Sequence, residues 1–511
     1  MLKAKRITAM ILVLVMVAAL AACNSGSTAS SGTAPTSTPA AAGSTGAASS
    51  EGAPVEETVE LSVCVSQTNW GNSIDPDLMD AFVKDVERAT NTKINMIAPP
   101  HNDYREKLNV MLTSGEIPDV FSVHQSLNQV PIYAIRGYCA PINDYVVNNA
   151  DLQQNMPADL SSLSIDDQLF ALPQGRFSVK IFHVREDLAQ KYGMNIKPEM
   201  TTQEFFDELS KVDQSEAVPY CLSKWTEDFQ IFYAPFGGYA GILKDANGNY
   251  YDGFQTQEIK DALAYIKSLY DAGLLDKEFI TNENAMMREK FYTGKAAVMT
   301  DYFHNHIQMR LQANNVEAPT DLLPIYTLVG PNGDKGNVNE ATQNSTCISA
   351  NTKNPQRAVD LIAHWWYSEE GATRSRIGIE GSHFTIEDGI ITPTTKALDS
   401  GYSLSPGGFT QSLPVISNLP FKWGGIGDDA YPKQLEILEN TYKDGNLGQK
   451  HVPPSGVSDL YDKNSPGYLQ NMKEVATKIV LGNATIDQAF ADYDAYWKSI
   501  QGDEMLAQLN S

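Results

Sequence analysis

The sequence predicts an α/β protein with mostly parallel β-sheets, divided into two lobes. Short apolar strand patterns alternate with amphipathic helix patterns from residue 61 to residue 123, and this alternation is typical of parallel sheets covered by helices. Residues 58–511 form the predicted globular part, which is too long for a single hydrophobic core and suits two lobes.

Residues 1–22 have the organisation of a lipoprotein signal peptide. Basic residues from Lys3 to Arg6 precede an apolar run at 9–22, which is shorter than the roughly 20 residues of a transmembrane helix. The run ends in Leu-Ala-Ala-Cys, which matches a bacterial lipobox, in which the Cys23 thiol receives fatty-acyl chains such as palmitate. The alternative is an ordinary small-residue cleavage site beside an incidental cysteine. We expect an anchor in the cell membrane, on its extracytoplasmic face, through Cys23.

A lipidated, disordered tether is predicted at residues 23–57. The segment consists almost entirely of Ser, Thr, Ala, Gly and Pro, which cannot bury enough apolar surface to offset the entropy lost on ordering. A flexible chain of this length spans roughly 30 to 35 Å on average. It would hold the globular part clear of a membrane surface.

Charge and cysteine content narrow the classes of function. The net charge of −24 disfavours nucleic acid and anionic lipid surfaces as partners, because both require basic patches. It also argues mildly against a strongly anionic ligand, although a local basic pocket could override the global field. The remaining cysteines are widely spaced without a CxxC motif, so buried free thiols are expected instead of disulfides or zinc. These are Cys64, Cys139, Cys221 and Cys347.

The first predicted sheet follows a β-α-β-α-β pattern. Its helices begin after Pro76 and at about Asp103, and the second stops at Gly115. Strands are expected at 61–65, 94–97 and 120–123. Ligands of parallel sheets bind outside the carboxyl ends of the strands. The loops expected to face a ligand are therefore 66–70, 99–103 and 124–128.

Helix caps and apolar periodicity agree at several later positions. A capping box from Thr201 to Glu204 starts one helix, and Asn354-Pro355 starts another that continues through Trp366. Further helices are expected at 259–273, 472–481 and 486–500, and strands at 179–184 and 296–300. No internal repeat is evident.

Several motifs resemble the signature of family 1 extracellular solute-binding lipoproteins of carbohydrate ABC transporters, in the oligosaccharide-binding branch. Each motif alone is weak, but together they occur in the expected order along essentially the whole mature chain. They lie at 102–104 (Asn-Asp-Tyr), 107–112, 114–120 (Ser-Gly-Glu-Ile-Pro-Asp-Val), 169–173, 184–188 (Val-Arg-Glu-Asp-Leu), 294–299 and 378–384.

The resemblance implies a two-lobed, periplasmic-binding-protein-like fold of type II, with hinge crossovers and a ligand cleft between the lobes. We expect lobe 1 at about 58–175 plus 296–350, and lobe 2 at about 176–295 plus 351–511. The family implies a carrier, here expected to be a monomer, that closes about its hinge on a ligand and delivers it to ABC permease subunits. Members of this branch resemble oligosaccharide binders, some of them for uronic-acid oligomers.

The calcium loop often present in this branch is expected to be absent. Such relatives carry an Asp-x-Asn-x-Asn-Gly loop after the capped helix, whereas here the segment at 212–217 is Val-Asp-Gln-Ser-Glu-Ala. A similar run at 245–252 lacks the bidentate Glu at loop position twelve, and its Asn247-Gly248 pair is typical of a hairpin turn. Neither a metal nor another cofactor is expected.

Aromatic side chains are the first candidates for holding a sugar, because the apolar faces of pyranose rings stack on aromatic rings. Trp70 follows the first strand in a polar loop at the predicted ligand edge, and core packing is the alternative. Trp225, with Phe236 and Tyr239 around a Gly-Gly pair, and Trp423 in another loop are candidates of the same kind. Trp365 and Trp366 lie in a helix pattern, where one of the adjacent pair is expected in the core, and Trp497 is expected to pack within a helix as well.

Polar candidates lie at strand ends and crossovers. Arg176 stands at the expected first crossover and Asp301 at the end of strand 296–300; for both, a salt bridge is the alternative to a ligand contact. Glu380, in a Gly-Ile-Glu-Gly turn, is expected near the cleft. His124, Asn305 and His306 follow strands, where a lone histidine is more often structural.

Two other classes of function remain open at this point. A secreted glycosidase needs a carboxylate pair, which 62 acidic residues supply by chance, but the chain contains no GxSxG, HExxH or P-loop motif. A peptide receptor, a receptor for another small solute, or one coupled to a sensor, would share the carrier architecture. The predicted function is a binding protein without catalysis, and the predicted ligand is an oligosaccharide.

Overall fold

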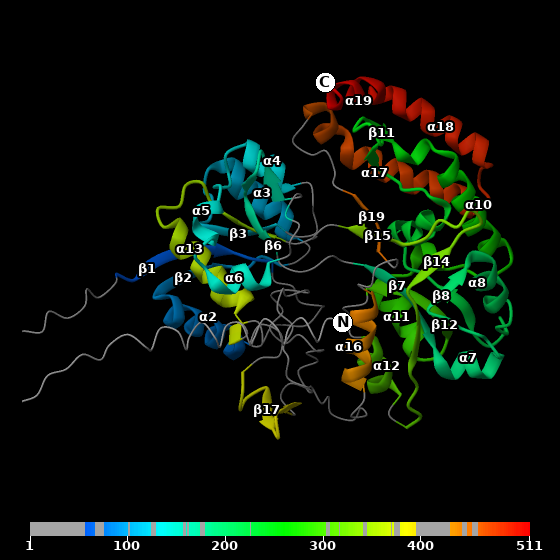
Figure 1. The fold of residues 1–511 in the computed structure, drawn as a ribbon, viewed down its shortest axis with the longest axis horizontal. Helices are drawn as coiled ribbons and strands as arrows, with labels where there is room; N and C mark the ends of the chain where they lie inside the picture. Colours follow the sequence, from blue (N-terminus) through cyan, green and yellow to red (C-terminus); the bar gives the residue numbers. More distant parts are fainter. Residues whose placement is uncertain are drawn as a thin grey trace, which may run out of the picture. The chain divides into compact units, whose positions relative to one another are not determined.

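A computed structural model describes residues 57–66, 76–100, 103–123, 129–156, 160, 163–173, 179–224, 226–302, 307–315, 317–340, 345–368, 370–371, 379–394, 430–441, 447–451 and 458–511. The predicted signal peptide, the lipidation site Cys23 and nearly all of the tether lie outside these residues. Residues 56–511 form one compact unit, and it is this unit that carries the fold (Figure 1).

The first lobe is built on a five-stranded sheet of order β2-β1-β3-β16-β6. β1 runs parallel to β2 and β3, as the β-α-β-α-β pattern predicted, and β16 is antiparallel to both β3 and β6. The strands are β1 (Val59–Cys64), β2 (Thr92–Ile97), β3 (Val120–Val123), β6 (Ala171–Pro173) and β16 (Ser345–Ile348).

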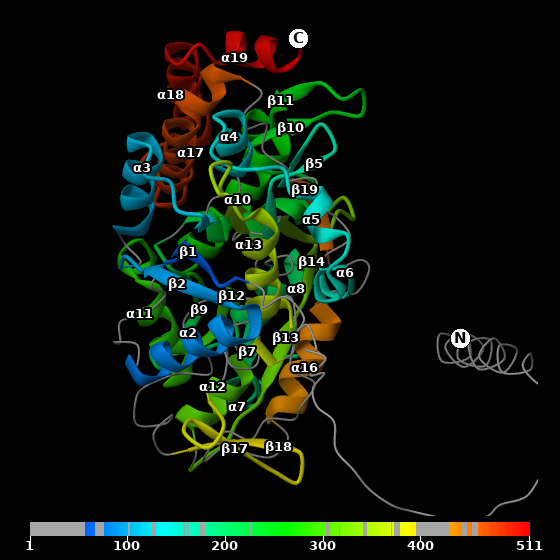
Figure 2. The same cartoon turned by 90° about the vertical axis from the view of Figure 1, so that its left-hand side faces the viewer.

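Helices cover this sheet and supply large side chains to its core. α13 lies beside α2 and contacts β16 (Figure 2). Trp365 and Trp366, on the π-helical turn that continues α13, are both fully buried, whereas only one of the pair was expected in the core. The helical elements are α2 (Pro76–Thr90), α3 (Tyr104–Ser114), α4 (Gln129–Ile135), α5 (Asn143–Val146), α6 (Ala150–Asn155), α13 (Pro355–Ile362) and η8 (Ala363–Tyr367).

The second lobe is built on a four-stranded sheet of order β13-β7-β12-β9. β12 is parallel to β9 and antiparallel to β7, which is antiparallel to β13. These strands are β7 (Lys180–Arg185), β9 (Val218–Cys221), β12 (Ala296–Tyr302) and β13 (Leu322–Ile325). Smaller pairs join β8 (Glu199–Thr201) to β14 (Thr327–Val329), β10 (Ile242–Lys244) to β11 (Tyr250–Asp252), and β15 (Asn337–Glu340) to β19 (Leu447–His451).

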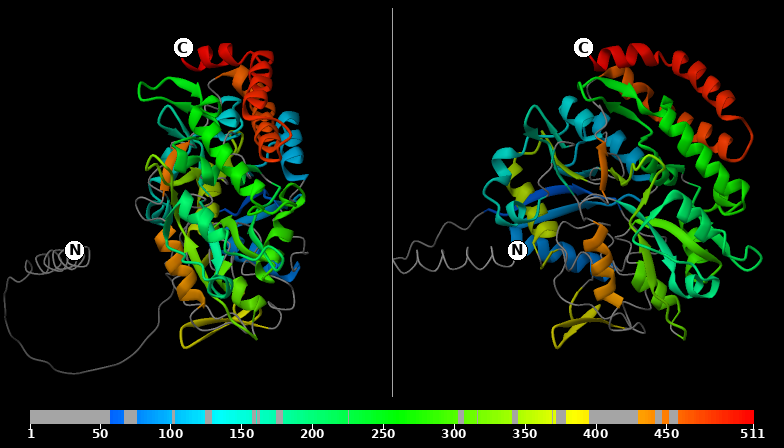
Figure 3. Two further views of the ribbon diagram at one scale, coloured as in Figure 1. Left: turned by 90° about the vertical axis from the view of Figure 1, so that its right-hand side faces the viewer. Right: turned by 45° about the vertical axis from the view of Figure 1, so that its right-hand side comes forward.

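The C-terminal helices complete the second lobe. α17 lies against α10 and pairs with α18 (Figure 3). The Tyr250 N–H donates to Asn510 Oδ1 at 2.6 Å and Asn510 Nδ2 donates back to the Tyr250 carbonyl at 3.0 Å, so the chain end is fixed to β11. The helices of this lobe are α7 (Glu186–Tyr192), α8 (Thr202–Leu209), α9 (Gln230–Tyr233), α10 (Gln257–Asp271), α11 (Asn284–Tyr292), α12 (Ile307–Asn314), α16 (Ala430–Thr441), α17 (Asp459–Val480), α18 (Ile486–Ser499) and α19 (Gly502–Leu509).

Most predicted elements are confirmed, with one helix longer than expected. The capping box of Thr201 and Glu204 is present, and α13 begins at Pro355. α17 begins at Asp459 instead of near residue 472 and contains Pro466. A Cβ at Gly467 would lie 2.8 Å from the Tyr496 hydroxyl on α18, so a larger residue there would displace this side chain. In the described part of the chain, no helix is both long and apolar enough to cross a membrane.

The predicted lobe boundaries are wrong in two places. Segment 296–350 was assigned to lobe 1, but β12 and β13 hydrogen-bond to β7 in the second sheet. Segment 351–511 was assigned to lobe 2, but α13 and the Trp365–Trp366 pair lie in the first hydrophobic core. A strand pattern does not specify which sheet the strand joins, because that depends on hydrogen bonds to strands distant in sequence.

Candidate functional site

Three strands of the second sheet bring polar side chains to one edge. In the pairing of β12 with β7, Asp301 lies opposite Ile181 and Tyr302 opposite Lys180, at the end of β12 and the start of β7. Met299 lies opposite Cys221, the last residue of the parallel strand β9. The carboxyl ends of β9 and β12 therefore meet the start of β7. We call this the β7–β9–β12 edge, and it is the edge at which parallel sheets bind ligands.

A buried carboxylate, Asp228, holds the lysine at this edge. Lys180 Nζ forms an ion pair with Asp228 Oδ1 and lies 4.7 Å from the centre of the Tyr302 ring. The Ser223 hydroxyl donates to Asp228 Oδ2 at 2.7 Å. The Asp228 side chain is only 2% exposed, whereas Lys180 is 22% exposed. Burial raises the pKa of Asp228, and the Lys180 charge opposes this rise.

A second ion pair fixes the end of β12. Arg288 Nε donates to Asp301 Oδ2 at 2.6 Å and Arg288 Nη2 to Asp301 Oδ1 at 3.0 Å. Burial alone would raise the pKa of Asp301, but Arg288 outweighs it and holds the pKa well below its usual range. The neighbouring His183 donates from Nε2 to the Asp301 carbonyl at 3.2 Å, and burial lowers the pKa of His183 to about 4.

The loop after β9 is held from behind by a buried amide. Asn282 is fully buried. Its backbone carbonyl accepts from the backbone N–H of Lys224 at 2.7 Å, and its side-chain Nδ2 donates to the Leu222 carbonyl at 3.0 Å. Asn282 also donates to Asp276, to which Lys290 is ion-paired at 2.8 Å. Side chains on this loop therefore start from a fixed backbone.

In the first lobe, two motif residues support the sheet from within the lobe. The Tyr104 hydroxyl contacts the carbonyl oxygens of Ser122 and Cys64, at the ends of β3 and β1. Asp119 Oδ2 accepts from the backbone N–H of Ser62 at 2.9 Å and from its hydroxyl at 2.7 Å. These contacts are internal to the lobe, so at Tyr104 and Asp119 the motif residues support the sheet.

Short segments join the two ligand-binding edges. Pro173 ends β6 at the carboxyl edge of the first sheet, and six residue steps later Val179 precedes β7. Six steps span at most roughly 22 Å. Glu340, the last residue of β15, is five steps from Ser345, the first residue of β16, which is at most roughly 18 Å. Both of these segments therefore cross between the lobes, and the first of them reaches the β7–β9–β12 edge.

The structure describes two of the six predicted ligand residues. Asp301 is at the predicted strand end, but it is 3% exposed and ion-paired with Arg288. This corresponds to the salt bridge given as the alternative to a ligand contact, here in the interior of the lobe. Glu380 is exposed, in a turn where Gly381 has a φ of 80°. The predictions Trp70, Arg176, Trp225 and Trp423 lie outside the described residues, as do His124, Asn305 and His306. Phe236 is buried in the core of the second lobe.

Sequence reasoning missed Lys180, Asp228 and Tyr302. Lys180 and Asp228 are 48 residues apart, so no local pattern pairs them. Tyr302 directly follows the predicted Asp301, and its position at a strand end was the one available signal.

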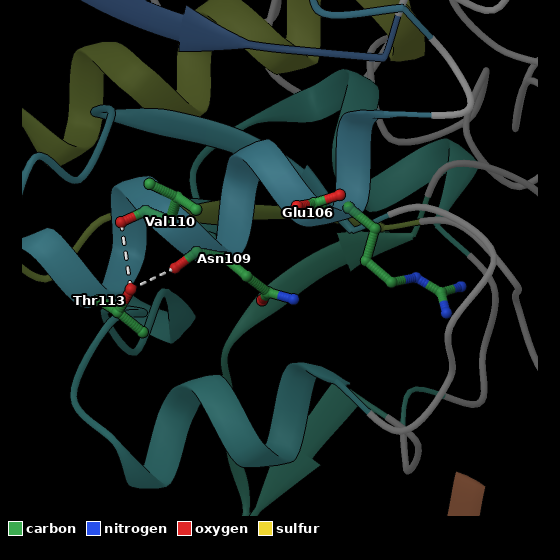
Figure 4. A pocket seen from close by; sticks show the side chains of 5 residues that line it. Glu106, Asn109, Val110 and Thr113 are labelled. Carbon is green, nitrogen blue, oxygen red and sulfur yellow. Dashed lines mark hydrogen bonds between the residues drawn. The ribbon is translucent and has the colours of Figure 1, made fainter.

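A surface hollow of about 510 Å³ lies along α3 and is separate from the β7–β9–β12 edge (Figure 4). It is lined by Arg105, Glu106, Asn109, Val110 and Thr113. The Thr113 hydroxyl donates to the Asn109 carbonyl at 2.7 Å, within the helix itself. The Val110 side chain is exposed, so the hollow is a shallow feature of the outer surface.

Metal binding was not predicted, and the residues described contain no group of three or more potential metal ligands. In the β10–β11 hairpin, Asp245 Oδ1 accepts from the backbone N–H groups of Asn247 and Asn249, both at 2.8 Å. These bonds close the predicted hairpin turn.

Comparison with known proteins places the fold in a family. The model of the family described as bacterial extracellular solute-binding protein matches residues 81–379, more than half of the chain. The chain belongs to the bacterial extracellular solute-binding protein family. The resemblance inferred from the motifs is thereby confirmed.

Individual relatives of this solute-binding protein cover between half and most of its length. Lipoprotein LipO of Bacillus subtilis is 22% identical over 84% of the chain and 88% of its own length. The polygalacturonan/rhamnogalacturonan-binding protein YtcQ of the same organism is 23% identical over 50% of the chain and 52% of its own length.

Solved structures of other solute-binding proteins share the two-lobed fold. The alginate-binding protein AlgQ2 superposes with a TM-score of 0.65 at 17% identity, covering 89% of the chain and 98% of AlgQ2. The N-glycan transport protein NgtS of Streptococcus pneumoniae gives a TM-score of 0.63 at 16% identity, with the same coverage. The predicted two-lobed fold class is confirmed.

Proposed function

We propose that this solute-binding protein is the extracytoplasmic, lipid-anchored binding component of an ABC importer, and that it captures an oligosaccharide by closure of its two lobes. The observation that carries the proposal is the ligand class of its relatives. Solved structures that share the fold over 89% of the chain include an alginate-binding protein, an N-glycan transport protein and a protein in complex with kestose or fructo-nystose. One curated relative is named for polygalacturonan and rhamnogalacturonan.

The arrangement of the sheets supports this role. A short crossover leads from the carboxyl edge of the first sheet to the polar β7–β9–β12 edge of the second sheet. In this arrangement one ligand can contact both lobes. Ligand that touches both lobes stabilises the closed form. The candidates for stacking on a sugar remain Trp70, Trp225 and Trp423, with Arg176 and Glu380 as polar partners. The closed protein then docks on the permease as a monomer, without catalysis.

In this arrangement Asp301 acts through its neighbours. Its carboxylate accepts from Arg288 and from the Tyr302 N–H, which donates to Oδ1 at 2.8 Å. At 3% exposure the carboxylate is out of reach of a sugar hydroxyl. We therefore assign Asp301 to holding Tyr302 at the β7–β9–β12 edge, and Tyr302 and Lys180 to the surface that faces the sugar.

The test is a thermal-shift screen of the compact unit, residues 56–511, against oligosaccharides of several classes, with peptides and amino acids as the contrast set. A ligand that binds only the folded state stabilises it by about 2.7 kcal/mol at a hundred times its Kd, which raises the Tm by a few degrees. A response to a glycan and an intact glycan recovered afterwards are expected. Silence across glycans with a response to peptides, or hydrolysis of the glycan, would overturn the proposal.

A further inference from the structure

The β7–β9–β12 edge carries three cations within the described part of the chain, and each is ion-paired to a carboxylate. Lys180 is paired with Asp228, Lys224 with Glu283, and Arg288 with Asp301. Among the described residues of this edge, three positive charges therefore meet three negative charges.

Separating two of these ion pairs so that the cation can bind an anionic ligand would cost considerable free energy. Asp228 and Asp301 are 2% and 3% exposed, so removing the cation from either would leave a buried, uncompensated charge. Arg288 approaches Asp301 through two of its nitrogens, which fixes the guanidinium in the plane of the carboxylate. A carboxylate on a ligand would therefore have to compete with Asp228 for Lys180, or with Asp301 for Arg288.

The long-range field acts in the same direction. The chain has a net charge of −24, which lowers the local concentration of an anionic ligand and its rate of association. Hydroxyl groups have no such penalty, and Lys180, at 22% exposure, can still donate to a hydroxyl while its charge stays balanced by Asp228.

We propose that this edge selects an uncharged oligosaccharide over one built of uronic acids. The inference rests on the proposed function and adds the charge of the ligand to it. It separates this protein from relatives that are named for alginate or polygalacturonan, because their named ligands are polyanions.

The experiment compares uronic-acid oligomers with their own carboxyl-reduced forms, which have the same length and linkage. Oligomers of galacturonate, mannuronate and glucuronate are titrated into the compact unit by calorimetry, each beside its reduced partner. We expect at least one neutral oligomer to bind at least tenfold more tightly than its uronate, with an affinity that changes less than twofold between 20 and 300 mM salt. A uronate that binds more tightly than its neutral partner overturns the inference and leaves the proposed function intact. If no oligomer binds, the inference is overturned, and the proposed function falls with it only if the thermal-shift screen also finds no glycan that binds.

A charge variant tests the cause. Asp228→Asn removes the carboxylate that balances Lys180 while keeping an oxygen acceptor for Ser223. The affinity for the uronate, relative to that for its neutral partner, should therefore rise at least threefold. Glu216→Gln is the matched control: it makes the same change in net charge and removes an ion pair with Lys191, just before the start of β9 and thus at the opposite end of the sheet. An equal gain in both variants, or in neither, would refute the local ion pair as the cause. If Asp228→Asn does not fold, the comparison on the unaltered protein still decides.

Discussion

The Tyr104 hydroxyl donates a 2.6 Å hydrogen bond to the carbonyl oxygen of Ser122, which ties the first turn of α3 to the end of β3. The same hydroxyl lies 3.1 Å from the Cys64 carbonyl at the end of β1. One buried phenol thus joins a helix start to two parallel strands, where the loops toward the ligand begin.

Replacing Tyr104 by Phe keeps the ring and removes the hydroxyl. We expect the free energy of unfolding to fall by about 1–3 kcal/mol, because two buried carbonyls lose a donor. Urea denaturation measures this. In the control Tyr192→Phe, the lost bond to Glu216 is exposed, and the change should stay within about 0.5 kcal/mol. Equal effects in the two variants would contradict the assigned role of Tyr104.

Replacing Arg288 by Met should cost about 3–5 kcal/mol of stability, because Asp301 would remain buried without its partner. The surface pair Lys197–Glu204 supplies the control: Lys197→Met should cost less than about 1 kcal/mol. Chemical denaturation of both variants at pH 7 makes the comparison. A small loss for Arg288→Met would mean that water reaches Asp301.

Stability should fall with acid through His183. Burial lowers its pKa from 6.5 to about 4, so the unfolded chain binds the proton first as the pH falls. This group therefore contributes stability above pH 6.5 that is lost toward pH 4, about 2 kcal/mol of it between pH 7.5 and pH 5.

Unfolding free energies at several pH values, for the unaltered protein and for His183→Gln, measure the contribution of His183. The glutamine keeps a donor for the Asp301 carbonyl, and its curve should be flatter. A residual slope is expected from His364, whose pKa is also lowered by burial. Two curves of the same slope would show that His183 does not titrate in this range.

Trp70→Ala should weaken glycan binding by an order of magnitude or more while leaving the Tm nearly unchanged. Trp497→Ala is the opposite case: its ring is 4% exposed, packs on Tyr493 and donates to Asp503, so its loss should cost about 3–5 kcal/mol. Calorimetric titration and thermal denaturation of both variants separate the two roles. A large loss of stability in Trp70→Ala would instead mark a core residue.

Local sequence patterns predicted the individual strands of the first sheet correctly. β1, β2 and β3 lie within two residues of the predicted strands, because apolar alternation and the stop at Gly115 are local properties. The predicted lobe 1 includes residues 345–348, but neither the strand β16 nor its pairing with β3 was predicted, since nothing near Ser345 specifies β3 as its partner.

The candidate site was predictable only in part, for a related reason. The position of Asp301 at the ligand edge followed from the end of its strand, but its exclusion from solvent depends on Arg288 in α11. The Lys180–Asp228 pair depends on two segments that meet only in the folded lobe. Local sequence can therefore indicate which end of a strand faces the ligand, and it does not show whether a charge at that end is already neutralised.

The bond between Asn510 and Tyr250 bears on how the chain matures. β7 and β12 precede α17–α19 in the chain, and the first sheet likewise waits for β16. Neither lobe is complete until its later segment has been synthesised, and in the second lobe Asn510 returns to β11 across 260 positions of sequence. Neither lobe is therefore a continuous half of the sequence, and a chain cut before α17 would lack part of the core of the second lobe.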